Sequence, residues 1–277
     1  MMKNKGIPVI GVPTINGGKW LKRLIDSVDY PVDNFIIFNN NGRGLITEVL
    51  DNFTKKKHPW IKNIEVCHLP SNLGVSTVWN LIIKSYINSP YWFITSDDIA
   101  FTPGLLKKMH EITLNGDIDM VHASDGWFNR GSYDLFVVKE SVIRRIGLFD
   151  ENLSPAYCED HDYASRCLRY TWDNPEDEIK PYILGASYYH GKVLSTDPTC
   201  YPDHASQTKR SDSGEISSEE MLKKVNNSNN HNKQYLIEKW GKECLQYPQK
   251  YPMGVENIPI DYTKYDIDFV RKKHFKF

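Results

Sequence analysis

The spacing of apolar and polar residues predicts strands that alternate with helices over residues 1–116. Short apolar runs are typical of buried strands, whereas apolar residues that recur every three or four positions are typical of one face of a helix. The expected strands are Pro8–Pro13, Phe35–Phe38, Ile64–Leu69 and Tyr91–Thr95, and the expected helices are Gly18–Val28, Leu45–Phe53, Asn72–Asn88 and Leu105–Leu114. This alternation indicates right-handed βαβ units around a mostly parallel sheet, which is an α/β fold.

The pattern changes after Gly116, where the strands look more antiparallel and the chain later becomes polar and rich in Asn. The further strands expected are Met120–Ser124, Asp134–Val138 and Ile183–Tyr189, and the further helices are Tyr157–Tyr170, Ser218–Val225 and Asn232–Trp240. We therefore predict three parts, residues 1–116, 117–205 and 206–277, of which the last is a helical and irregular extension.

Composition excludes several classes of protein. The chain has 277 residues with 34 Lys and Arg against 35 Asp and Glu, so its net charge of −1 offers no global field for nucleic acid. No apolar run approaches the roughly 18–20 residues of a membrane span, and the N-terminal stretch lacks the apolar core of a signal peptide. The five cysteines are scattered without a CxxC pair, which argues against a disulfide framework or a zinc site. We expect a cytoplasmic protein without a nucleic-acid partner or an integral membrane segment.

Polar clusters follow the predicted strands of the first part. They are Pro13-Thr14, Asn39–Asn41, Pro70–Gly74 and Ser96–Asp98. Ligands of open α/β sheets bind beyond the carboxyl ends of the strands, where the strand order reverses. The clusters therefore predict a ligand site along that edge of the sheet.

Two of these clusters have a specific chemical interpretation and a simpler alternative. Ser96-Asp97-Asp98 fits a hard divalent cation, which takes carboxylates together with substrate phosphates and waters, but it also fits a capping turn. The stretch Pro70–Ser76 leads into a helix, whose free N–H groups could hold a diphosphate. The alternative is that Ser71 or Asn72 caps that helix.

A third acidic cluster lies at the start of the helix predicted at Tyr157–Tyr170. Glu159, Asp160 and Asp162 suit the positive end of a helix dipole, but three carboxylates so close together repel one another. A general base, or a site for sugar hydroxyls, would explain the crowding. Arg166 and Arg169 are expected to pair with part of this charge.

His190 follows the last predicted strand of the middle part, in the segment Tyr188-Tyr189-His190-Gly191. A histidine at a strand end could bind the same cation as the acidic pair. The alternative is a surface histidine, or one whose hydrogen bonds are satisfied locally.

The order of these motifs resembles the family-2-like glycosyltransferases with the GT-A fold, over roughly Ile7 to Lys192. The chain is also similar to the small glycosyltransferases encoded by large DNA viruses of algae. The resemblance rests on seven motifs in a fixed order along the chain. They are a strand followed by Pro-Thr, a strand followed by an Asn-rich turn, Asn-Leu-Gly before a helix, an aromatic strand followed by Asp-Asp, the segment Gly-Leu-Phe-Asp-Glu, the segment Glu-Asp-x-Asp, and a strand followed by His-Gly.

The resemblance implies a nucleotide-diphospho-sugar donor and a Mn²⁺ or Mg²⁺ ion. Residues 1–116 would be the nucleotide-sugar-binding half, Rossmann-like with a mostly parallel sheet, and residues 117–205 the acceptor-binding, catalytic half. The donor-binding residues carried over are Pro13, Thr14, Asn39, Asn72, Gly74, Asn80, Ser96 and Asp97. Asn39 departs from the Asp that is usual in the family, and an amide offers a donor that a carboxylate lacks.

The same resemblance implies the catalytic residues. Ser96-Asp97-Asp98 matches the metal-binding DxD motif with Ser in place of the first Asp, so the metal is assigned to Asp98 with His190. Glu159-Asp160 matches the family's acidic pair, with Asp160 as the expected base of an inverting enzyme. Asp162 and Trp127 are expected at the acceptor or the sugar, and Trp240-Gly241 resembles a C-terminal feature of some relatives.

The expected activity is therefore metal-dependent, hexosyltransferase-type transfer to a glycan or glycoprotein. In a viral chain, the cytoplasm would be that of the host cell. One alternative is a sugar-nucleotide nucleotidyltransferase, for which Gly17-Gly18-Lys19 is a short match to the expected phosphate loop. The other is a relative that binds sugar without catalysis, which the Ser at position 96 keeps open.

Overall fold

The computed structural model of the chain describes residues 6–15, 18–40, 47–55, 57–123, 133–184, 188–189, 192–193, 202–204 and 219–240. These residues form two compact units. The first unit contains all the strands together with helices α1 (Gly18–Asp26), α2 (Thr47–Thr54) and α4 (Leu105–Thr113). No helix of the described residues is long and apolar enough to cross a bilayer.

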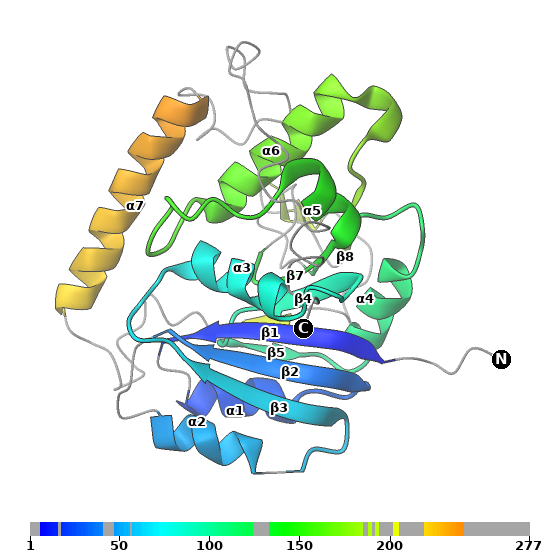
Figure 1. Cartoon of the computed structure of the whole chain (residues 1–277), viewed down its shortest axis with the longest axis vertical. Coiled ribbons are helices and arrows are strands. Elements are labelled where there is room, and N and C mark those ends of the chain that lie inside the picture. Colours follow the sequence, from blue (N-terminus) through cyan, green and yellow to red (C-terminus); the bar gives the residue numbers. More distant parts are fainter. Residues whose placement is uncertain are drawn as a thin grey trace, which may run out of the picture. The chain divides into compact units, whose positions relative to one another are not determined.

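A seven-stranded sheet organises the first unit (Figure 1). Its strands, in spatial order, are β3 (Ile61–His68), β2 (Val32–Asn39), β1 (Ile7–Thr14), β4 (Tyr91–Thr95), β7 (Leu135–Lys139), β6 (Met120–Ala123) and β8 (Pro181–Leu184). Strands β3, β2, β1 and β4 are parallel, β7 is antiparallel to both of its neighbours, and β8 is parallel to β6. The predicted α/β fold, with a parallel first half followed by mixed strands, is confirmed.

The structure differs from the prediction at two places, one in the middle part and one in the first part. The strand expected at Ile183–Tyr189 is described as β8 and a separate two-residue strand β9 (Tyr188–Tyr189), which pairs with β10 (Lys192–Val193). A short strand β5 (Ile99–Phe101) follows β4 and pairs with β11 (Pro202–His204), although a three-residue apolar run carries no periodic signal.

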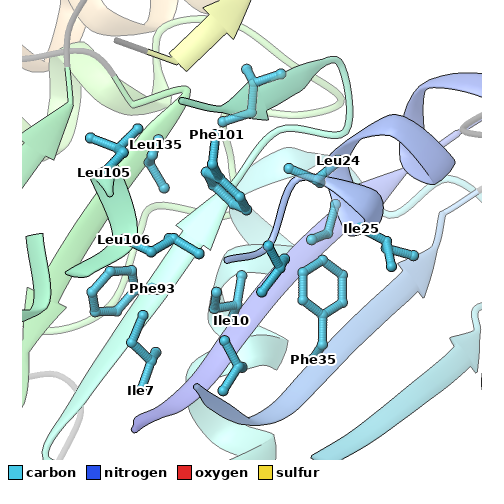
Figure 2. Packing of buried hydrophobic residues seen from close by; sticks show 14 of the residues in the cluster. Ile7, Ile10, Leu24, Ile25, Phe35, Phe93, Phe101, Leu105, Leu106 and Leu135 are labelled. Atoms are coloured by element: carbon cyan, nitrogen blue, oxygen red, sulfur yellow. The ribbon is translucent and has the colours of Figure 1, made fainter. Parts of the chain in front are cut away.

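The core of the first unit lies between the sheet and α1, α2 and α4. Ile10 is in register with Phe35 on β2 and with Phe93 on β4, so these three side chains form one row across the sheet. Figure 2 shows this row packed against Leu24 and Ile25 of α1 and Leu106 of α4. All of these side chains are buried, which explains why their helices carry apolar residues at three- and four-residue spacing.

The second unit is helical. It contains α3 (Val75–Ser85), α5 (Glu140–Ile146), α6 (Glu159–Asp173), the 3₁₀ turn η1 (Pro175–Asp177) and α7 (Glu219–Trp240). The two helical pieces predicted at Ser218–Val225 and Asn232–Trp240 are one continuous helix, because no Gly or Pro interrupts the Asn-rich stretch between them. Helix α6 begins two residues later than predicted, after Tyr157 and Cys158 adopt positive φ angles of 76° and 75°.

Candidate active site

The strand order reverses at β1. The chain passes from β1 to β2 and β3 on one side and then returns to β4 on the other side of β1. In open α/β sheets such a switch point is where ligands bind. The polar residues Thr14 and Ser96–Asp98 occupy the carboxyl ends of the two strands that flank it.

A hydrogen bond links these two strand ends. Thr14 Oγ1 donates to Asp97 Oδ2 over 2.5 Å. Burial, opposed by the Thr14 hydrogen bond and assisted by the neighbouring Asp98 charge, raises the pKa of Asp97 to about 7. The predicted site residues Thr14 and Asp97 therefore lie together, and Asp97 is close to half-protonated at neutral pH.

Asp98 and Ser96 have different surroundings. Asp98 is 9% exposed. The Ser96 backbone N–H donates to the Asp134 carbonyl over 2.8 Å, and Ser96 Oγ donates to the same oxygen over 3.3 Å. An Asp in place of Ser96 with the same side-chain direction would bring a carboxylate against that carbonyl, which gives a physical reason for the departure from DxD.

The described residues contain no group of three or more His, Cys, Asp or Glu side chains that could hold a metal ion. Mg²⁺ and Mn²⁺ are commonly held by one or two carboxylates together with substrate phosphates and waters. Asp98, beside Asp97, fits that kind of partial ligand set. His190, the other predicted ligand, and Trp127, the predicted acceptor contact, lie outside the described residues.

Asn39 is fully buried at the end of β2, in register with Thr14 on one side and His68 on the other. Its Nδ2 lies 3.0 Å from His68 Nδ1, and His68 Nε2 lies 2.9 Å from Asp51 Oδ1. Because the amide nitrogen can only donate, His68 Nδ1 accepts, and the Nε2 proton points at Asp51. An Asp at position 39 would require a proton on His68 Nδ1, so Asn39 suits the tautomer in which Nε2 carries the proton toward Asp51. Pro13 lies beside this row, one residue before Thr14 and in register with Phe38.

The helix start at Gly74 is not capped by a side chain. Gly74 is the N-cap of α3 with φ 91°, and Asn72 Oδ1 instead accepts from Asn40 Nδ2 over 3.0 Å. The first helical N–H, from Val75, donates to the Pro155 carbonyl over 2.8 Å. A Cβ on Gly74 would lie 2.8 Å from Ser154 Oγ, so both the φ angle and the close approach require glycine. The alternative of a Ser71 or Asn72 cap is therefore wrong.

Asn80 uses its side chain within the second unit. Its Nδ2 donates to the Phe149 carbonyl over 2.9 Å and to Glu151 Oε1 over 2.8 Å, and its Oδ1 accepts from the Phe149 N–H over 2.9 Å. The Asn80 amide thus fixes the Gly-Leu-Phe-Asp-Glu segment to α3.

Asn80→Ala is expected to lower the free energy of unfolding by about 2–4 kcal/mol, because it removes the hydrogen bonds that the Asn80 amide makes to the buried N–H and C=O of Phe149. Denaturant titration measures this change. Asn227→Ala, at an exposed position of α7, is the matched control and should change stability by less than about 0.5 kcal/mol. Equal effects of the two substitutions would contradict the structural role of Asn80.

Glu159 and Asp160 begin α6 in unequal environments. Glu159 is 8% exposed, and its Oε2 has no hydrogen-bond partner within the described part of the chain. Burial, together with the neighbouring Asp160 charge, raises the pKa of Glu159 to about 8. Asp160 is half-buried, and its Oδ1 accepts from the His161 N–H over 2.8 Å. The first acid of the pair is therefore mostly protonated at neutral pH.

Glu159→Gln is expected to stabilise the protein at neutral and mildly alkaline pH. The folded-state pKa of about 8 lies above the ordinary value of 4.5, so the folded state binds more protons, and stability falls as pH rises from about 4.5 to 8. A neutral Gln removes that loss, a gain on the order of 1–3 kcal/mol at pH 7. Thermal unfolding at pH 5 and pH 8 measures it, with the exposed Glu176→Gln as control. An equal pH dependence in wild type and Glu159→Gln would contradict the raised pKa.

Asp162 is fully buried, and both of its oxygens are engaged. Oδ2 accepts from Arg166 Nε over 2.9 Å, and Oδ1 accepts from Trp240 Nε1 over 2.8 Å and lies 2.7 Å from Lys239 Nζ. The expected pairing with Arg166 is confirmed, whereas Arg169 pairs with Asp173. Both oxygens thus have partners within the second unit, and the predicted contact between Asp162 and an acceptor or sugar stays a prediction.

Sequence reasoning did not find what α7 contributes to this unit. Besides the contacts of Trp240 and Lys239 with Asp162, α7 makes two contacts with Asp150. The Tyr235 hydroxyl donates to Asp150 Oδ2 over 2.8 Å, and Lys239 Nζ lies 2.7 Å from the same oxygen. Burial alone would raise the pKa of Asp150, but the Lys239 charge and hydrogen bonds from Lys239, Asn152 and Tyr235 outweigh it and lower the pKa. The signal in the sequence was the recurrence of Ser228, Asn232, Leu236 and Trp240 at four-residue spacing.

The sheet topology defines an α/β protein with the GT-A fold. A model of the family described as glycosyl transferase family 2 matches residues 9–165, and the chain belongs to that family. It is 22% identical to a galactofuranosyl glycosyltransferase of Leishmania donovani, over 58% of this chain and 52% of that protein. The chain thus spans about half the length of this curated relative.

Solved structures support the same fold. PcManGT, a mannosyltransferase from Pyrobaculum calidifontis in complex with GDP-Man and Mn²⁺, is 11% identical with a TM-score of 0.52, over 70% of this chain and 57% of that one. TarS 1-349 of S. aureus, in complex with UDP-GlcNAc, is 13% identical with a TM-score of 0.53, over 86% of this chain and 72% of that one. At such low identity these likenesses establish the GT-A fold alone.

Proposed function

We propose that this family-2 glycosyltransferase moves a sugar from a nucleotide-diphospho-sugar to an acceptor hydroxyl, depends on a divalent metal, and inverts the anomeric configuration. The observation that carries the proposal is the Thr14–Asp97 hydrogen bond across the switch point between β1 and β4, with Asp98 adjacent to it. The acceptor is proposed to be a glycan or glycoprotein, and the donated sugar a hexose.

Most of the proposed donor-binding residues belong to the first unit. Pro13 and Thr14 would line the nucleoside, and Asn39 would meet the base or ribose with an amide whose nitrogen is already held by His68. Asn72 and Gly74 are proposed near the nucleotide, while Ser96 and Asp97 are proposed at the ribose or the sugar. The complexes of PcManGT with GDP-Man and of TarS with UDP-GlcNAc support a nucleotide sugar as the ligand class.

Asp98 is the proposed metal ligand, with His190. Asp97 is less suited to this role, because its Oδ2 already accepts a hydrogen bond from Thr14. A bound Mn²⁺ or Mg²⁺ would neutralise charge on the leaving diphosphate. The Mn²⁺ in the PcManGT complex supports the choice of cation.

Asp160 is the proposed general base. It would take the proton of the acceptor hydroxyl while that oxygen forms the new bond to the anomeric carbon and the bond to the nucleoside diphosphate breaks with its electron pair. Displacement from the opposite face inverts the anomeric centre. Glu159 is less suited as the base near neutral pH, because its pKa of about 8 keeps it protonated.

The experiment is a donor screen with and without Mn²⁺. UDP- and GDP-linked hexoses are tested for a rise in melting temperature and then for release of UDP or GDP, which mass spectrometry detects. We expect Mn²⁺-dependent stabilisation by one donor class, and nucleoside diphosphate release from it. Pyrophosphate release from a nucleoside triphosphate and a sugar phosphate would instead identify a nucleotidyltransferase. Binding without any turnover would identify a non-catalytic relative.

A further inference from the structure

The segment that leads into the Glu159–Asp160 pair has an unusual backbone. Tyr157 and Cys158, neither of them glycine, have φ angles of 76° and 75°. A left-handed conformation at a non-glycine residue costs on the order of 1–3 kcal/mol and persists only where surrounding contacts enforce it. Because Cys158 is the N-cap of α6, these two residues set the direction in which the acidic pair leaves the turn.

One side chain of α7 contacts both carbonyls of this turn. Asn232 Nδ2 donates to the Ala156 carbonyl over 2.9 Å and to the Tyr157 carbonyl over 3.0 Å. Ser228, one turn earlier on α7, donates its hydroxyl to the Ala156 carbonyl over 3.0 Å. Asn232 is fully buried, so these bonds form without competition from water.

The Asn232 amide is used only as a donor. Its Oδ1 is buried and has no hydrogen-bond partner within the described residues. Leaving a buried polar atom unpaired costs on the order of 1–3 kcal/mol. Asn232 thus keeps one unsatisfied oxygen, while its Nδ2 donates two hydrogen bonds to the turn.

The same face of α7 also contacts Asp162, which follows the acidic pair in the sequence. Trp240 lies two four-residue steps beyond Asn232, roughly 12 Å along the helix axis, and its Nε1 donates to Asp162. Leu236, between them, packs with Leu153, Cys158 and Trp240 in one buried cluster. Helix α7, yellow to orange in Figure 1, therefore contacts the Tyr157 backbone, which precedes Glu159, and the Asp162 side chain, which follows Asp160.

We propose that Asn232 is a positioning residue for the Glu159–Asp160 pair: its amide fixes the left-handed turn from which Asp160 is presented to the acceptor. This inference rests on the proposed function, because it assigns Asn232 to the same reaction. Asn232 acts through the backbone of the turn and is not itself a catalytic group.

Asn232→Asp tests the proposal, with Asn230→Asp as the matched control. The first substitution places carboxylate oxygens against two carbonyl oxygens, while the second adds the same charge at an exposed position two residues away. With the donor that the screen identifies, we expect Asn232→Asp to lower kcat by roughly 10–100-fold, because small displacements of reacting groups are that costly. The KM for the donor should stay within about twofold, since the proposed donor-binding residues Thr14, Asn39 and Asp97 belong to the first unit. Asn230→Asp should match the wild type.

Hydrogen exchange of the segment 156–162 provides a readout that does not depend on sugar chemistry. We expect its backbone amides to exchange at least about tenfold faster in Asn232→Asp and at the wild-type rate in Asn230→Asp. If Asn232→Asp does not fold, Asn232→Ser, which removes the paired amide donors without adding charge, is expected to give the same changes.

The outcomes distinguish the positioning role of Asn232 from the proposed transferase function. A folded Asn232 variant with wild-type kcat, or with wild-type exchange in the segment 156–162, would overturn the positioning role while the transferase activity of the wild type still stands. A wild-type protein that turns over no UDP- or GDP-linked sugar would overturn the proposed function, and the positioning role with it. Equal losses of kcat in Asn232→Asp and Asn230→Asp would also contradict the proposal, because they would trace to charge alone.

Discussion

Replacing Asp160 with Asn is expected to reduce the kcat of sugar transfer by about 10²–10⁴-fold, which is the usual contribution of a general base. Asn has nearly the same shape as Asp but cannot take the proton of the sugar-accepting hydroxyl at neutral pH. Donor binding should be unchanged, because the proposed donor-binding residues Thr14, Asn39 and Asp97 belong to the first unit. Initial rates over a range of donor concentrations separate kcat from KM.

Two further variants make this result specific. Asp117→Asn, the same chemical change at an exposed position, should leave kcat unchanged. Glu159→Gln should cost less activity than Asp160→Asn near neutral pH, because Glu159, with a pKa of about 8, is already mostly neutral there. If Glu159→Gln abolished transfer while Asp160→Asn retained it, the two acids would have to exchange roles.

The second large effect is expected from Asp98→Asn. Without this carboxylate the protein should lose Mn²⁺-dependent turnover by at least about 100-fold, since charge neutralisation of the leaving diphosphate is worth several kcal/mol. The rise in melting temperature that Mn²⁺ adds to donor binding should disappear as well, while the protein without ligands keeps its own melting temperature.

Asp97→Asn is the matched comparison for Asp98→Asn. Asp97 accepts from Thr14 and has a pKa of about 7, so its amide should preserve more of the Mn²⁺ dependence than the amide at position 98. Unchanged turnover and unchanged Mn²⁺ dependence in Asp98→Asn would remove Asp98 as the metal ligand. Loss of both in Asp97→Asn alone would transfer that role to Asp97.

Much of the first unit could be predicted from the sequence because its strands are continuous apolar runs between turn residues. Tyr91–Thr95 has the predicted bounds, and the chain order of strands and helices was enough to predict parallel pairing. The meeting of Thr14 with Asp97 also follows from the general rule that polar residues at neighbouring strand ends share one edge. The spacing of apolar and polar residues did not predict β5, because three residues are too few to show a period.

The second unit was less predictable because its decisive contacts are polar and distant in sequence. Asp162 looks like a companion of Glu159 and Asp160, yet its partner Trp240 lies 78 positions further along the chain. Asn232 stands in an Asn-rich stretch that is typical of solvent-exposed chain, and nothing in its type distinguishes it from the exposed Asn230. Only the four-residue spacing with Leu236 and Trp240 marked it as part of a buried face.

The central claim is a metal-assisted, single-displacement sugar transfer with Asp160 as the base. The most direct measurement is the anomeric configuration of the product, read by NMR from the coupling of the anomeric proton, after reaction with the donor identified in the presence of Mn²⁺. We expect a configuration opposite to that of the donor. A product with retained configuration would contradict it, because a single displacement assisted by Asp160 cannot retain the anomeric centre.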